Sequence, residues 1–247
     1  MRAIILLLSI LAVISCSINK HKAKSSIDER QPAHANAEIY ITDGYFRIDD
    51  NSKNEQIKEE YSNNMAFIAL ISKDDGIIAK PANIEVVFSE EDCMGLSGAS
   101  LYIDGCLDYI ALISGLNRYN KNPMEKTAEN MEKVLFPDKP ISFAFNNDTY
   151  ELYATAEVED DVYNSKNYQL YFKRGAVVQP ISYIEQLEHN MPSILFIGDI
   201  DNDGYADLLL QEGYNYEYHE MVLYLSSYAR EGELVKNVAT DEEWRDC

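Results

Sequence analysis

The sequence predicts a mainly β fold (α+β), built as an antiparallel sheet or sandwich with one or two short helices. Two observations indicate this class. Short apolar or alternating runs recur along the chain and are separated by turn residues such as Gly, Pro, Asn and Asp. The chain also has 18 Tyr but only 8 Phe and 1 Trp, and tyrosine suits strand faces that are half exposed.

The first half of the folded part is predicted to combine strands with both helices. Residues 37–49 alternate around Asp43-Gly44, which is typical of a hairpin turn, and the polar residues 52–63 predict a short helix. Residues 123–135 begin with proline and predict the longer helix. Its apolar side chains at helical spacing are expected in the core: Met124, Ala128, Met131 and Leu135. Strands are expected at 65–71, 84–88, 101–103 and 107–113.

The second half reads almost entirely as strands. Residues 150–158 alternate, so that Tyr150, Leu152 and Ala154 share one face of the strand while Glu151 and Tyr153 share the other. Further strands are expected at 168–173, 176–179, 194–197, 208–210 and 221–225.

The N-terminus predicts export and lipid attachment. Residues 1–15 combine Arg2 with an apolar run that is too short to span a bilayer, which is typical of a signal peptide. The run ends at Val13-Ile14-Ser15-Cys16, which resembles the cleavage box of bacterial lipoproteins; the resemblance implies that Cys16 becomes the acylated first residue. The alternative is an ordinary secretory signal. Because Ser17, not Asp, follows the cysteine, we expect an outer-membrane location in the cell envelope, on the periplasmic or the surface face.

A flexible tether is predicted between this anchor and the folded part. Residues 16–37 lack an apolar period and are rich in Ser, Ala, Lys and Asn. Residues 38–247 are then expected to form a single mainly β domain.

Charge limits the partners. The chain carries 21 basic and 42 acidic side chains, a formal net charge of −21. Such a surface repels nucleic acid and anionic lipid, so we expect no nucleic-acid partner and membrane contact through the lipid anchor.

Three further cysteines bear on the tail of the chain. Cys93, Cys106 and Cys247 would meet an oxidising compartment after export, and their odd number leaves one thiol over. The sequence does not choose among the pairings. We predict a disulfide between Cys93 and Cys247, because it would fix a cysteine at the last position.

An acidic turn lies within the predicted hairpin of residues 194–210. Asp199, Asp201 and Asp203 can point inward from a tight loop, Tyr205 can offer its backbone carbonyl, and Asp207 can close the cage. Oxygen-only ligation by several carboxylates suits calcium best. The alternative is an Asx-rich turn without metal, in which the carboxylates would repel one another.

This loop is not an EF-hand, because its twelfth position from Asp199 is Leu210 instead of a glutamate. The stretch Ile197 to Leu210 instead resembles the calcium loop of FG-GAP and VCBS-type repeats, which implies a structural calcium ion held by Asp199, Asp201, Asp203, Tyr205 and Asp207. Only one copy is present, so a full β-propeller is not expected. More broadly, residues 93–247 are similar to a group of uncharacterised exported bacterial proteins that share the 223–227 and 232–236 segments and a final cysteine.

Catalytic motifs are absent from the sequence. It contains no H-E-x-x-H, C-x-x-C or glycine-rich phosphate loop, so no catalytic residue is assigned. Tyr214, Tyr216 and Tyr218 alternate and could stack on a glycan or contact a protein; the alternative is a tyrosine-rich strand that covers the sheet. The sequence thus favours a lipid-anchored binding or structural module over an enzyme. The alternative function is an envelope hydrolase acting on polysaccharide or peptide through an unidentified carboxylate pair.

Overall fold

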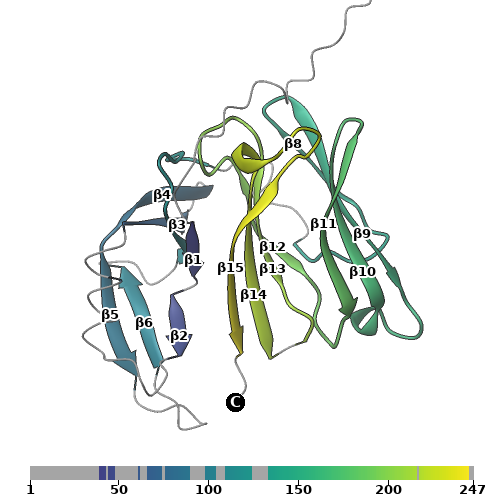
Figure 1. Ribbon diagram of the computed structural model, residues 1–247, viewed down its shortest axis with the longest axis horizontal. Coiled ribbons are helices and arrows are strands. Elements are labelled where there is room, and N and C mark those ends of the chain that lie inside the picture. Colours follow the sequence, from purple (N-terminus) through teal and green to yellow (C-terminus); the bar gives the residue numbers. More distant parts are fainter. Residues whose placement is uncertain are drawn as a thin grey trace, which may run out of the picture.

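The computed structural model confirms the mainly β class. It describes residues 39–42, 44–47, 61, 66–73, 76–89, 98–103, 109–123, 133–215 and 217–244. Within these residues all strand pairs are antiparallel, and no sheet closes into a barrel or propeller (Figure 1). The helical positions among them are Tyr61, which is π-helical, and two short 3₁₀ turns.

The strands form four sheets, which we number I to IV; in Figure 1 sheets I and II lie at the left, sheet I below sheet II, sheet III lies in the middle and sheet IV at the right. Sheet I has the order β2-β6-β5 and sheet II the order β1-β7-β3-β4. Sheets III and IV are simple meanders, β12-β13-β14-β15 and β11-β10-β9-β8. The strand bounds in sheets I and II are β1 Tyr40–Thr42, β2 Tyr45–Arg47, β3 Phe67–Lys73, β4 Gly76–Ala82, β5 Ile84–Ser89, β6 Gly98–Ile103 and β7 Tyr109–Ser114. Those in sheets III and IV are β8 Ile141–Phe145, β9 Asp148–Glu157, β10 Lys166–Arg174, β11 Val177–Gln186, β12 Ser193–Gly198, β13 Asp207–Glu212, β14 Tyr218–Leu225 and β15 Lys236–Trp244.

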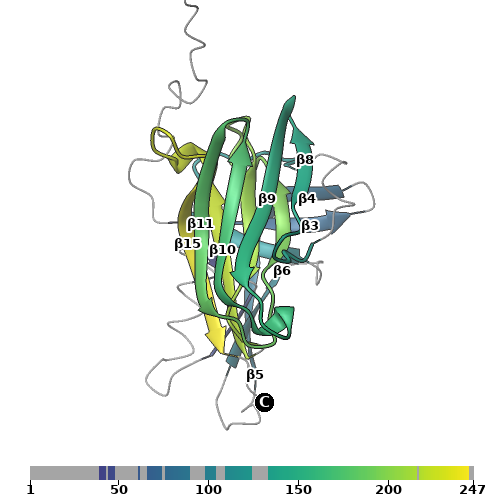
Figure 2. The ribbon, with the colours of Figure 1, turned by 90° about the vertical axis from the view of Figure 1, so that its right-hand side faces the viewer.

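The four sheets stack as layers around three hydrophobic cores. Side chains of sheets I and II share one core, those of sheets II and III a second, and those of sheets III and IV a third. Sheet IV is the outermost layer on one side and faces the viewer in Figure 2. Sheet III therefore lies in the interior, with a core on each face.

Burial on both faces explains the apolar runs of sheet III. In β13, Leu208 and Leu210 point into the core shared with sheet IV, whereas Leu209 points into the core shared with sheet II. All three are fully buried. A strand covered on both faces has no solvent side on which polar residues would be favoured, so its sequence is continuously apolar.

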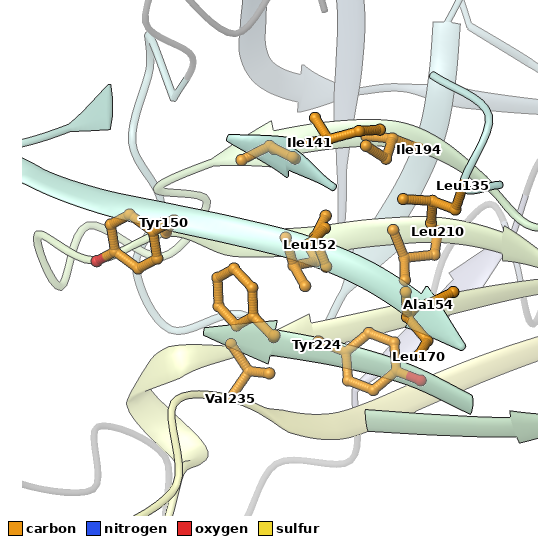
Figure 3. Packing of buried hydrophobic residues seen from close by; sticks show 14 of the residues in the cluster. Leu135, Ile141, Tyr150, Leu152, Ala154, Leu170, Ile194, Leu210, Tyr224 and Val235 are labelled. Atoms are coloured by element: carbon orange, nitrogen blue, oxygen red, sulfur yellow. The ribbon is translucent and has the colours of Figure 1, made fainter. Parts of the chain in front are cut away.

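The core between sheets III and IV holds the largest cluster (Figure 3). Leu152 and Leu170 from sheet IV meet Leu210 and Tyr224 from sheet III. The buried hydroxyl of Tyr168 donates to the carbonyl of Leu135 at 2.8 Å, so this core contains a polar group with its bond satisfied.

Several elements differ from the prediction. Strands β4, β8 and β15 were not predicted, and β11 is ten residues long although only 176–179 was expected. Pro81 in β4 and Pro180 in β11 are tolerated because both strands are sheet edges, where one side of the backbone needs no partner strand.

The predicted helices fall mostly outside the described residues, which omit 48–60 and 124–132. At the end of the longer one the prediction is wrong: Val134 forms an isolated antiparallel bridge with Ser193 and is not helical. Leu135 is nevertheless buried in the core, as its apolar spacing suggested. Nowhere in the described part of the chain does a helix combine the length and apolarity needed to cross a bilayer.

Residues 1–38 and all four cysteines also lie outside the described residues. The signal peptide, lipidation at Cys16, the tether and the Cys93–Cys247 disulfide therefore stay predictions.

Candidate functional site

The aspartate loop connects β12 to β13, as predicted for the hairpin near 194–210. It begins where Gly198 pairs with Asp207 at the end of the ladder. Two backbone hydrogen bonds join the loop to residues 120–123: Asp199 N donates to Pro123 O at 2.7 Å, and Asn120 N donates to Ile200 O at 2.8 Å. Gly198 is required here, because a Cβ atom at this position would lie 2.0 Å from Pro123 O.

Carboxylates organise the loop from within. Asp199 accepts the backbone N–H groups of Asp203 and Gly204 at 2.9 and 3.0 Å, and Asp203 accepts that of Tyr205 at 2.8 Å. Gly204 adopts a φ of 88°, which an L-residue rarely takes. Asp207 accepts Ile200 N at 2.7 Å across the loop. These bonds close a tight turn with the acid groups directed inward.

Two serines hold the loop from outside. They begin the 3₁₀ turn Ser226–Tyr228, which follows β14. Ser226 donates its backbone N–H to Asp207 at 2.8 Å and its hydroxyl to Asp203 at 2.6 Å, and the Ser227 hydroxyl donates to Asp201. The sequence singled out residues 223–227 only through a resemblance and assigned these serines no contact.

Three of the predicted ligands converge. Asp199, Asp201 and Asp207 are buried, and one carboxylate oxygen of each lies within 4.8 Å of the other two. Asp203 belongs to the loop but is only partly buried and is not in this group of three. The ring of Tyr205 lies against the Arg174 guanidinium at 4.7 Å; its carbonyl as a ligand stays a prediction.

The site is electrostatically unfavourable for anions alone. The pKa of Asp201 is raised to about 6. Burial is the largest cause, and the negative charges of Asp203 and Asp199 act in the same direction. Burial is also the largest cause that raises the pKa of Asp199, and it raises the pKa of Asp207 well above the usual range together with the neighbouring Asp201 and Asp203. Bringing a cation among these groups would favour their ionised forms.

The donor set fits a hard divalent cation. Each of the three groups offers carboxylate oxygen, and an oxygen that accepts one N–H or O–H group keeps a second lone pair for a metal. Calcium takes six to eight oxygens in adaptable geometry, so these residues fit calcium, with Asp203 and the Tyr205 carbonyl as the further predicted donors.

A pocket of about 720 Å³ is the second candidate site. It contains two of the predicted ligand-surface residues, Tyr214 and Tyr218, whose rings pack at 5.2 Å; Tyr216 lies outside the described residues. The other lining residues come from sheet IV and the segments next to it, namely Lys166, Asn167, Tyr183, Ile184, Glu185, Gln186 and Glu188, together with Glu220 of β14.

A buried carboxyl group near this pocket was missed by sequence reasoning. Glu212 ends β13 and is 5% exposed. It accepts the hydroxyls of Ser182 and Tyr224, the latter at 2.9 Å, and burial raises its pKa to about 7. Its position two residues after Leu210, on the same strand face as that leucine, is the one signal in the sequence that it continues a buried strand.

Comparisons of the chain with protein-family models, with curated proteins and with solved structures found no match. The resemblance of the aspartate loop to FG-GAP and VCBS-type repeats therefore stays an expectation based on its residues. No catalytic pair was assigned for the hydrolase alternative, so it too stays a prediction.

Proposed function

We propose that this protein is a lipid-anchored envelope protein whose domain is stabilised by calcium and acts as a binding module. The observation that carries the proposal is the convergence of Asp199, Asp201 and Asp207, all buried, with carboxylate oxygens within 4.8 Å of one another. A calcium ion in this loop is structural, because it would join two strands of the interior sheet.

The magnitude is sufficient for a structural role. If calcium is present at a hundredfold above its dissociation constant, binding adds roughly 2.7 kcal/mol to the free energy of unfolding. Domains are stable by only about 5–15 kcal/mol in total, so losing the ion would remove a large fraction.

The anchor and the location are supported by the sequence. Residues 1–15 and Cys16 are typical of an exported lipoprotein, and Ser17 favours the outer membrane. Globomycin treatment, which blocks lipoprotein signal cleavage, should cause the full-length precursor to accumulate. Replacing Cys16 by Ser should release the protein from the membrane fraction, whereas the neighbouring control Ser17→Ala should leave it attached.

The binding role is supported by the pocket of about 720 Å³, which is within the size range of small-molecule sites. Its tyrosines combine an apolar ring with a polar hydroxyl and can contact ligands of either character.

The calcium site is tested by melting the purified chain in calcium and in excess chelator. We expect a higher Tm in calcium for the wild-type chain and a strongly reduced difference for Asp201→Asn. Asp160→Asn is the matched control, since Asp160 is an exposed acid outside the loop, and it should keep the full difference. Equal melting temperatures of the wild-type chain with and without chelator would refute the calcium proposal.

A further inference from the structure

The pocket is the place where the core between sheets III and IV ends. Along β14, Val222 and Tyr224 point into that core, and the preceding residues on the same face are Glu220 and Tyr218, which line the pocket. Opposite them lie Ile184 and Gln186 of the edge strand β11, which share the face on which Ser182 bonds Glu212 of sheet III. The two layers thus continue past the hydrophobic side chains and enclose a space lined by aromatic and polar groups.

The aromatic wall is held in place by local hydrogen bonds. Asn215 Oδ1 accepts the backbone N–H of Tyr218 at 2.7 Å, and Glu188 N donates to Tyr214 O at 2.5 Å. At the rim, Tyr183 lies on the outward face of β11, where its hydroxyl donates to Asn167 Oδ1 at 2.7 Å. The backbone that carries Tyr214 and Tyr218 is therefore held in place before a ligand binds, which lowers the ordering cost of binding.

Charge in the pocket is predominantly negative. Glu185, Glu188 and Glu220 are among its lining residues. Among the described lining residues the one lysine is Lys166, whose ammonium group lies 3.1 Å from Glu159 Oε1 and is thereby already paired with an acid. Burial is the largest cause that raises the pKa of Glu220, and the nearby Glu242 carboxylate is the second.

These features distinguish between ligand classes. An anion would be repelled by the carboxylates. A neutral sugar could stack on the rings but would leave the like charges uncompensated. A cation carried on an aliphatic chain would satisfy both walls, because tyrosine faces attract cations and the glutamates attract positive charge.

We infer that this pocket binds an organic ammonium group, carried by a free aliphatic amine or by a lysine side chain. The inference rests on the proposed binding role of the domain and specifies its ligand class. Tyr214 and Tyr218 contact the alkyl chain and the charge, while Glu188 and Glu220 pair with the ammonium group.

Isothermal titration of the purified full chain, in calcium and at low ionic strength, tests the inference with three probes. Cadaverine represents a free amine, N-acetyl-lysine amide a lysine side chain, and a neutral N-acetylglucosamine trimer a glycan. We expect at least one ammonium probe to bind the wild-type chain. Its affinity should fall at least tenfold when NaCl is raised from 20 to 200 mM. This dependence on salt is measured on the wild-type chain, so it does not depend on whether a variant folds.

Variants then locate the site. Glu188→Gln with Glu220→Gln should weaken ammonium binding at least tenfold, and Tyr218→Leu, which keeps the bulk but removes the ring, about fivefold. The matched control Glu157→Gln with Glu231→Gln also removes two acids, both exposed and outside the pocket, and should bind like the wild-type chain. Each variant must retain the wild-type near-UV circular dichroism spectrum.

Three results would overturn the inference. Binding of the trimer in preference to both ammonium probes would keep the binding role but refute the ligand class. If the control pair Glu157→Gln with Glu231→Gln weakened ammonium binding as much as Glu188→Gln with Glu220→Gln, the binding would be due to general surface charge and not to the pocket. No binding of any probe would refute the inference and remove the support for the binding role, while the calcium-dependent melting difference would still test the structural site separately.

Discussion

Replacing Glu212 by Gln isolates the effect of one buried acid on stability. Glu212 is 5% exposed and lies between the core of sheets III and IV and the pocket, with Ser182 and Tyr224 donating hydroxyls to it. Burial is the largest cause that raises its pKa, from the usual 4.5 to about 7. Glutamine keeps the length and one accepting oxygen but does not ionise.

The sign follows from proton binding. Between pH 4.5 and about 7, folded Glu212 keeps a proton that the unfolded chain has released, so the free energy of unfolding falls as the pH rises through this window. At roughly 1.4 kcal/mol per pKa unit, the full effect is about 3 kcal/mol, and most of it lies between about pH 5 and pH 8. The glutamine variant lacks this contribution.

Urea unfolding of both chains at pH 5 and pH 8, with calcium constant, measures the effect. We expect the loss of stability between the two pH values to be about 2–3 kcal/mol smaller in Glu212→Gln than in the wild-type chain. The aspartate loop titrates equally in both chains, so its contribution cancels in the comparison. The exposed Glu157→Gln serves as control and should retain the wild-type pH dependence. The same pH dependence in wild type and Glu212→Gln would refute the reasoning.

Three further outcomes are expected. Ser226→Ala removes the hydroxyl bonded to Asp203 and should lower stability by about 1 kcal/mol in urea unfolding, with a smaller Tm gain from calcium. Leu209→Ala leaves a cavity between sheets II and III and should cost about 2–5 kcal/mol by the same assay, whereas a value below 1 kcal/mol would contradict its burial there. Peptide mapping without reductant should recover Cys93 linked to Cys247. Cys93→Ser should then cost roughly 4–5 kcal/mol at most, and a Cys106 linkage would contradict the predicted pairing.

Strands buried on both faces were the most predictable elements. The runs that became β12, β13 and β14 are apolar enough to identify without a partner, because both of their faces are covered. Strand β15 (KNVATDEEW) was missed because it is polar, as an edge strand with a solvent-facing side can be. Most of β11 was missed because Pro180 argues against a central strand, and only the sheet order shows that β11 is an edge.

The sites were predictable only where their residues are close in sequence. Asp199, Asp201 and Asp207 lie within one turn, so their spacing alone indicates that they can converge. Ser226 and Ser227 bond to the same loop from 19 to 26 residues further along the chain, at the end of β14. For the pocket, the tyrosines were noticed, but the wall contributed by β11 depends on how two sheets stack, which no local pattern specifies.

Strand β13 connects the two candidate sites. Asp207 begins it and Glu212 ends it, so the aspartate loop and the pocket lie at opposite ends of one strand, about 17 Å apart at 3.4 Å per residue. A calcium ion in the loop would fix the β12–β13 pair, which contributes to the cores on both faces of sheet III. The pocket walls are instead fixed by bonds of Asn215, Asn167 and Glu188, none of which involves the loop. Calcium and a pocket ligand should therefore each stabilise the folded state by mass action without changing the affinity of the other. If the affinity of the pocket for its ligand changed with calcium well below the melting temperature, β13 would have to exist in two arrangements, of which calcium binds one more tightly.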